Sequence, residues 1–72
     1  MAPTPNQKVA PSALERLAAD RDWEVRRAAL RMMWGIEKAP LAQLADAILA
    51  RLADQEWQVR QQALQTLSKL EP

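Results

Sequence analysis

Apolar residues recur at helical spacing in four segments of the chain, and polar or helix-breaking residues separate these segments. The spacing predicts helices over residues 12–19, 23–38, 41–52 and 57–70. The clearest apolar stripe is the third, which consists of Leu41, Leu44, Ala45, Ile48, Leu49 and Leu52. These positions follow i, i+3, i+4, i+7, i+8 and i+11, so one wide side of this helix must be buried.

Residues suited to helix ends stand at the boundaries of these segments. Ser12 with Glu15 has the spacing of a capping box, in which a hydroxyl and a carboxylate each bind a free backbone amide. Asp22 and Glu56 precede the second and fourth segments, where a carboxylate meets the positive end of the helix dipole. Pro40 separates the second helix from the third, because proline is excluded from a helix interior.

The second and fourth predicted helices begin with nearly the same sequence motif. The sequence DRDWEVRRAAL begins at Asp20 and DQEWQVRQQAL begins at Asp54, an offset of 34 residues. The preceding helices also match, as ERLAAD and ARLAD, with one extra Ala in the first turn. A fixed period of this kind indicates stacked helical hairpins that bury their faces against one another. We therefore predict an all-α fold of two stacked antiparallel helical hairpins, with residues 12–38 and 39–72 as the repeats and 1–11 as a disordered or extended Pro-rich arm.

The repeated positions resemble HEAT and compact HEAT-like repeats of the bilin-lyase type. They are Asp20, Val25, Arg26, Ala29 and Leu30, and then Asp54, Val59, Arg60, Ala63 and Leu64. The resemblance covers roughly residues 12–71 and implies a short segment of an α-α superhelix. A 34-residue period also suits tetratricopeptide repeats, but the W-x2-L-G-x2-Y signature of those repeats is missing after Trp23.

The resemblance also implies a ladder of hydrogen bonds between adjacent repeats. In the family, the turn Asp and the Arg of the second helix form it, which here means Asp20 with Arg60 or Asp54 with Arg26. An Arg that follows a core Val lies at the edge of the buried face, where a carboxylate must offset its desolvation. We expect these four residues to be structural.

Composition narrows the function classes. Ten basic and nine acidic residues give a net charge of only +1. This charge is too small to bind nucleic acid or an anionic membrane by non-specific electrostatic attraction. The chain has no Cys, its N-terminus lacks the features of a signal peptide, and no apolar stretch is long enough to span a membrane. We expect a soluble, cytoplasmic protein without a membrane association.

The residue types needed for catalysis are scarce. The sequence has no His and no Cys, and its single Gly excludes a glycine-rich phosphate loop. The carboxylates of Asp20, Asp22, Asp54 and Glu56 occupy positions that caps and turns explain. We therefore predict no enzymatic activity, no metal and no cofactor.

One helix face is a candidate binding surface. Arg27, Arg31, Trp34 and Lys38 recur at i, i+4, i+7 and i+11, and in HEAT-like arrays the second helices line the concave surface. The matched positions of the second repeat, beginning at Gln61, are polar but uncharged. Three interpretations stay open: a solvated face on which Arg stems cover Trp34, a site for an acidic or helical protein, and a phosphate or nucleic-acid site.

The ends of the array carry unusual apolar surface. Stacked repeats need about three units, and this sequence contains two. Met32, Met33 and Trp34 together add more apolar surface to the second helix than two hairpins can bury. A module of a longer array, a self-associating domain and a small two-repeat design would each explain this. We expect Trp23 and Trp57 to cover the turns between helices rather than to be exposed contact residues. The function predicted is a non-catalytic scaffold for protein–protein association, including self-association, and the alternative is nucleic-acid or phosphate binding through Arg27, Arg31 and Lys38.

Overall fold

Five α-helices and one short 3₁₀ helix make up residues 11–71, the part of the chain that the computed structural model describes. The helices are α1 (Pro11–Leu17), α2 (Trp23–Trp34), α3 (Lys38–Ala42), α4 (Ala45–Ala50), η1 (Arg51–Ala53) and α5 (Trp57–Ser68). No strand occurs in this part of the chain, and the predicted all-α class is confirmed. Of the predicted arm, residues 1–10 lie outside the described residues, and Pro11 already belongs to α1.

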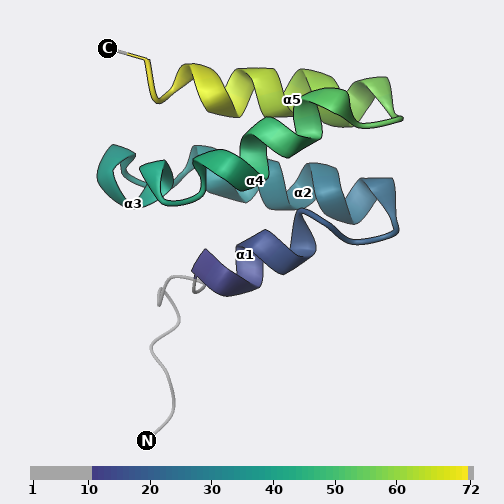
Figure 1. The fold of residues 1–72 in the computed structure, drawn as a ribbon, viewed down its shortest axis with the longest axis horizontal. Coiled ribbons are helices and arrows are strands. Elements are labelled where there is room, and N and C mark those ends of the chain that lie inside the picture. The colour runs from purple at the N-terminus through teal and green to yellow at the C-terminus, as the bar shows by residue number, and fades with distance from the viewer. Residues whose placement is uncertain (1–10, 72) are drawn as a thin grey trace, which may run out of the picture.

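The helices form two hairpins that stack side by side (Figure 1). In the first hairpin α1 leads into α2, and in the second α4 and η1 lead into α5. Helices α2 and α5 contact each other along their length and run in the same direction, whereas α1 and α4 run against them. This arrangement confirms the two stacked antiparallel hairpins predicted from the 34-residue offset.

The third predicted helix is wrong as a continuous element. Leu44 leaves the helical conformation, with φ −100° and ψ 7°, so residues 41–52 divide into the end of α3, α4 and η1. The amides of Gln43 and Leu44 donate to Pro40 and Leu41, three residues back, which tightens the chain at the break. Leu41 and Leu44 are both buried on either side of it. Residues 11–71 therefore contain five α-helices where the sequence predicts four.

Two helix ends also differ from the prediction. Pro11 occupies the first position of α1, which tolerates a residue without an amide hydrogen, so Ser12 lies inside the helix and the predicted capping box is absent. Helix α2 ends at Trp34 and not near Lys38, because Gly35 takes the C-cap and donates to the carbonyls of Met32 and Met33. The predicted N-cap is confirmed at Asp22, whose carboxylate accepts from the Glu24 amide at 2.9 Å.

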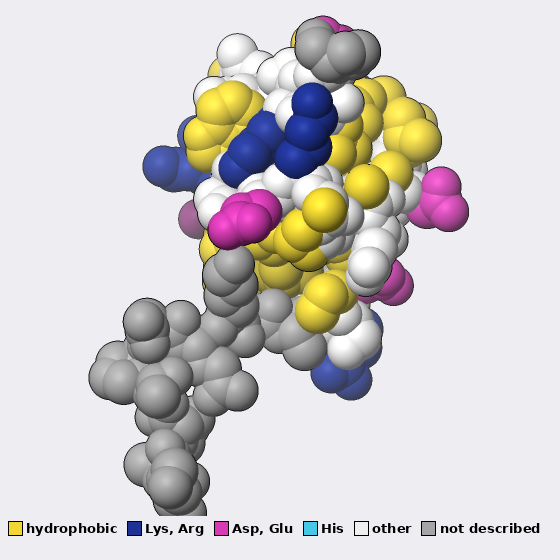
Figure 2. All heavy atoms as spheres, turned by 90° about the vertical axis from the view of Figure 1, so that its left-hand side faces the viewer, with side chains coloured by type: hydrophobic (Ala, Val, Ile, Leu, Met, Phe, Trp, Pro, Cys, Tyr) yellow, Lys and Arg dark blue, Asp and Glu magenta, His cyan; other side chains and the backbone are white. Residues whose placement is uncertain are grey.

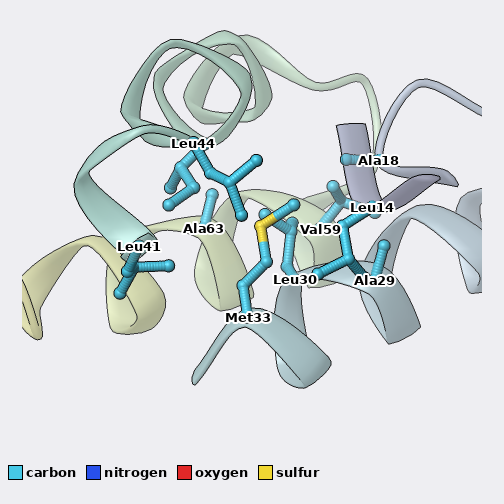
Figure 3. Packing of buried hydrophobic residues seen from close by; sticks show 10 residues of the cluster. Leu14, Ala18, Ala29, Leu30, Met33, Leu41, Leu44, Val59 and Ala63 are labelled. Carbon is cyan, nitrogen blue, oxygen red and sulfur yellow. The ribbon is translucent and has the colours of Figure 1, made fainter. Parts of the chain in front are cut away.

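The core lies between the two hairpins and takes side chains from all five α-helices. Its members are Leu14, Ala18, Ala29, Leu30, Met33, Leu41, Leu44, Ile48, Val59 and Ala63. In Figure 3, Met33 rises from α2 toward Leu44, and Leu41 closes the core from the side of α3. Burial at about 25 cal/mol per Å² of apolar surface is the main stabilising term for so small a fold.

Candidate interaction surfaces

The predicted binding stripe lies along the groove between α2 and α5. Arg27, Arg31 and Trp34 of α2 line an open hollow of about 440 Å³, and Gln62 and Gln65 of α5 form its other side. Both arginines are exposed, and neither donates a side-chain hydrogen bond or forms an ion pair within residues 11–71. Their charges are therefore available to a ligand in the hollow.

Lys38 does not extend this stripe. Because α2 ends at Trp34, Lys38 begins a separate helix, α3, and the helical spacing from Arg27 no longer applies. Its ammonium donates to the backbone carbonyl of Glu71 at 3.1 Å, near the end of the second repeat. Lys38 ties the two hairpins together at the end opposite the ladder.

A lysine that the spacing did not identify contacts Trp34. Lys69 places its ammonium 5.9 Å from the centre of the Trp34 ring and donates to the carbonyls of Trp34 and Ile36. The cation over this ring is therefore Lys69, where the sequence suggested Arg stems. Lys69 matches Gly35 in the 34-residue offset, so the repeat gives no signal for it. Figure 2 shows basic side chains against apolar surface at this end of the molecule.

The ladder joins Arg26 to Asp54 across the two hairpins. The guanidinium donates from Nε to Oδ2 at 2.7 Å and from Nη2 to Oδ1 at 2.9 Å, a bidentate arrangement. Arg51 Nη1 adds a third bond to Oδ2 at 3.1 Å, and the Glu56 amide donates to Oδ1 at 3.0 Å. The hydrogen bonds that Arg26 donates to Asp54 lower the pKa of the buried Asp54 carboxyl and raise the pKa of Arg26.

Asp20 and Arg60, the other ladder candidates, are not paired within the described residues. Arg60 Nη1 donates to the carbonyls of Asp54 at 2.7 Å and Gln55 at 3.1 Å. Arg26 Nη1 binds its own turn in the same way, at Asp20 and Arg21. Within the described part of the chain, the Asp20 carboxylate accepts one hydrogen bond, from the Asp22 amide at 3.3 Å. Both repeats thus hold their Arg against the turn, but only Arg26 meets a carboxylate.

A buried polar contact between the hairpins had no clear signal in the sequence. Thr66 Oγ1 donates to the Leu30 carbonyl at 2.8 Å and accepts from Gln62 Nε2 at 3.2 Å. Both side chains are buried, although the matched positions of the first repeat are Ala28 and Met32. A Thr and a Gln four residues apart inside an otherwise apolar helix were the available clue.

Apolar side chains remain exposed on the two outer sides of the stack. On α2 these include Met32, which is 46% exposed, and on the second hairpin they include Trp57 at 60% and Leu64 at 63%. Trp23 is partly buried against the core, whereas Trp57 is exposed, which contradicts the prediction that neither Trp is an exposed contact residue. Each outer side is where a further hairpin would lie in a longer stack.

Two further observations bear on function. No helix within residues 11–71 is long and apolar enough to cross a membrane. The same residues contain no cluster of three or more carboxylate, His or Cys side chains that could hold a metal ion.

Comparison with known proteins gives one result. No curated protein and no solved structure matches the chain significantly. The family model described as HEAT repeats matches residues 10–72, which includes both hairpins and the Asp-Arg ladder. This chain therefore belongs to the HEAT repeat family.

Proposed function

We propose that this chain is a non-catalytic scaffold for protein–protein association, and that it also associates with itself. HEAT repeats commonly serve as scaffolds for protein interaction, and the family is generally non-enzymatic. The observation that carries the proposal is the exposure of Met32, Trp57 and Leu64 on the two outer sides of the stack. Large apolar side chains that face solvent together are typical of protein contacts.

Sedimentation equilibrium of the full chain tests self-association, with helical content followed by circular dichroism over the same dilution series. We expect the average mass to rise with concentration while the helical content stays constant. A mass equal to that of one chain at every concentration would refute self-association. Loss of helix on dilution would instead show that the hairpins fold only when their outer sides are covered.

The hollow between α2 and α5 is proposed as a second binding surface, for an acidic protein segment. Arg27 and Arg31 stand one turn apart without carboxylate partners among the described residues, and Trp34 offers an aromatic face beside them. Guanidinium groups bind carboxylates with two parallel hydrogen bonds, which favours an acidic helix or strand in this hollow. Lys38, bound to the Glu71 carbonyl, is at most peripheral to this surface.

The same two arginines support the alternative, a phosphate or nucleic-acid site. A fluorescent oligoglutamate and a fluorescent oligothymidylate of equal charge, titrated with the full chain at several salt concentrations, distinguish the two. We expect oligoglutamate to bind more tightly, and we expect the Arg27→Gln/Arg31→Gln variant to lose binding. The variant Arg16→Gln/Arg21→Gln is the control, because it removes the same charge from exposed positions elsewhere. Tighter binding of the oligothymidylate with a steep dependence on salt would favour the alternative.

A further inference from the structure

Matched positions of the two repeats are buried on opposite sides of the stack. On α5, Val59, Gln62 and Thr66 are buried on the side that faces α2. The residues 34 positions earlier are Val25, Ala28 and Met32, which we call the N-terminal face. Ala28 and Met32 are exposed and Val25 is half-buried, because no second hairpin covers this side of α2 within residues 11–71.

The second hairpin shows the converse. Leu30 and Met33 of α2 are fully buried against it, whereas the matched Leu64 and Leu67 of α5 are exposed and half-buried. Leu14 is buried and its counterpart Leu49 is exposed, once the extra Ala of the first turn is allowed for. We call Leu49, Trp57, Leu64 and Leu67 the C-terminal face. The N-terminal face therefore occupies the same repeat positions as the surface that the second hairpin buries against the first. In the same way, the C-terminal face occupies the repeat positions that the first hairpin buries against the second.

The ladder residues at the two ends of the stack also lack a ladder partner within residues 11–71. Arg60 is held against its turn by Nη1 just as Arg26 is, but its Nε and Nη2 have no acceptor among residues 11–71. At the other end, among residues 11–71, the Asp20 carboxylate accepts one long hydrogen bond, from a backbone amide. Arg60 on the C-terminal side therefore has donors to spare within this part of the chain, and Asp20 on the N-terminal side has acceptor capacity to spare, as a pair like Arg26–Asp54 would require.

We infer that a second copy of this chain docks head to tail, with its N-terminal face against the C-terminal face of the first copy. Arg60 of the first copy pairs with Asp20 of the second, as Arg26 pairs with Asp54 within one chain. This inference rests on the proposed self-association and specifies its geometry. Such a contact is heterologous and leaves both outer faces of the pair open, so assembly continues beyond a dimer into a longer superhelix.

The contact between copies is weaker than the contact inside one chain. In the internal interface Thr66 donates to the Leu30 carbonyl, but the matched residue Met32 has no hydrogen to donate to the Leu64 carbonyl. Met32 instead supplies a flexible apolar side chain, which adapts to the surface that it meets. We therefore expect reversible association that depends on concentration.

Charge exchange tests the register directly. In sedimentation velocity, wild-type chain should give a mass that keeps rising past the dimer with concentration. Arg60→Glu and Asp20→Arg should each weaken association by about tenfold or more, because like charges then face each other. An equimolar mixture of the two variants should recover wild-type association, since every contact again joins opposite charges. Glu37→Arg, an exposed charge reversal at the other end of the helices, is the control.

A second pair of variants tests the same contact and leaves unchanged the turns that contain Asp20 and that bind Arg60. Leu64→Gln should reduce association, and Leu52→Gln should not. Leu52 is 37% exposed and its counterpart Leu17 is 39% exposed, so neither repeat uses this position for stacking. Helical content by circular dichroism, measured for each variant, verifies that the chain is folded.

The outcomes separate this inference from the proposed function. Wild-type association that stops at a dimer, or a variant mixture that fails to recover, overturns head-to-tail stacking while self-association stands. Equal association of the Leu64→Gln and Leu52→Gln variants also overturns it. A wild-type chain that is monomeric at every concentration removes both self-association and its geometry, and leaves the Arg27–Trp34 hollow to be tested with oligoglutamate.

Discussion

Replacing Asp54 by Asn tests whether the ladder stabilises the fold. The side chain keeps its size and one oxygen, but an NH2 group takes the place of the other oxygen. Asp54 accepts four hydrogen bonds, of which two come from Arg26 and one from Arg51. The Asn amide group can still accept from a backbone amide, but it cannot bind the Arg26 guanidinium in a bidentate way. The positive charge at Arg26 then lacks its carboxylate in a half-buried position.

The expected loss follows from these contacts. Hydrogen bonds that involve a charged group contribute about 1.5–3 kcal/mol each, and removing one partner of a buried pair costs about 3–5 kcal/mol. The Arg26 side chain keeps 12% of its surface exposed and can turn partly toward water, which reduces the cost. We therefore expect Asp54→Asn to lower the free energy of unfolding by about 3 kcal/mol. A domain of this length has roughly 4–11 kcal/mol in total, so the loss is a large fraction.

The change in the free energy of unfolding is measured by urea unfolding monitored by circular dichroism, at a concentration where the chain is monomeric. The matched control is Asp20→Asn, whose carboxylate accepts one backbone amide at 3.3 Å and should cost about 0.5–1 kcal/mol. If the two variants lose equal stability, the reasoning about the ladder is wrong.

The pH dependence of stability gives an independent check on Asp54. Its pKa is lowered in the folded chain, chiefly by the hydrogen bond from Arg26, so the unfolded chain binds the proton more readily. The stability that this carboxylate contributes is complete above its ordinary value of 3.8 and is lost as the pH falls through the lower folded value. The difference in unfolding free energy between wild type and Asp54→Asn should therefore shrink below pH 3.8. A difference that stays constant down to the acid transition would contradict this.

Three further substitutions test the interior and one helix end, each by urea unfolding. Thr66→Val should cost about 1–2 kcal/mol, because the Leu30 carbonyl loses a buried donor while the side-chain volume is kept; no change would mean that this bond contributes nothing. Met33→Ala should cost about 2–5 kcal/mol, since Met33 is fully buried in the centre of the core, and a loss below that range would indicate that the core repacks. Gly35→Ala should stabilise by about 0.4–1 kcal/mol, because Gly35 has ordinary helical angles and a new Cβ would lie 3.5 Å from the Met32 carbonyl oxygen; destabilisation would show that the turn needs glycine.

Much of the architecture could be read from the chain itself. The 34-residue offset between Trp23 and Trp57 predicted the two hairpins, and the resemblance to HEAT repeats implied the ladder, as either Asp20 with Arg60 or Asp54 with Arg26. The break at Leu44 could not be predicted in this way. The apolar stripe of residues 41–52 continues at helical spacing across the break, so periodicity alone describes a single helix. Packing against the core, and not local preference, decides that the chain tightens there.

The sequence predicted the kinds of residue at the candidate site, but not all of the residues that form it. Arg27, Arg31 and Trp34 do share one surface, because three positions within α2 keep helical spacing. Lys38 falls outside it, since the helix ends four residues earlier, at Trp34, with Gly35 at the C-cap. Lys69 reaches Trp34 only because α5 lies beside α2, and no spacing along one helix can indicate such a contact.

The sequence by itself determined the helical class and the two-hairpin repeat, because these depend on local spacing and residue type, and its resemblance to HEAT repeats implied the pairing of Asp with Arg. Only the tertiary structure decided which copy of each repeated residue is used. Arg26 binds Asp54 while Arg60 binds no carboxylate among residues 11–71, and Leu30 is buried while Leu64 is exposed, although the local sequences are nearly the same. The physical reason is that, within residues 11–71, each hairpin packs against the other through one side, so equivalent side chains face protein in one repeat and solvent in the other.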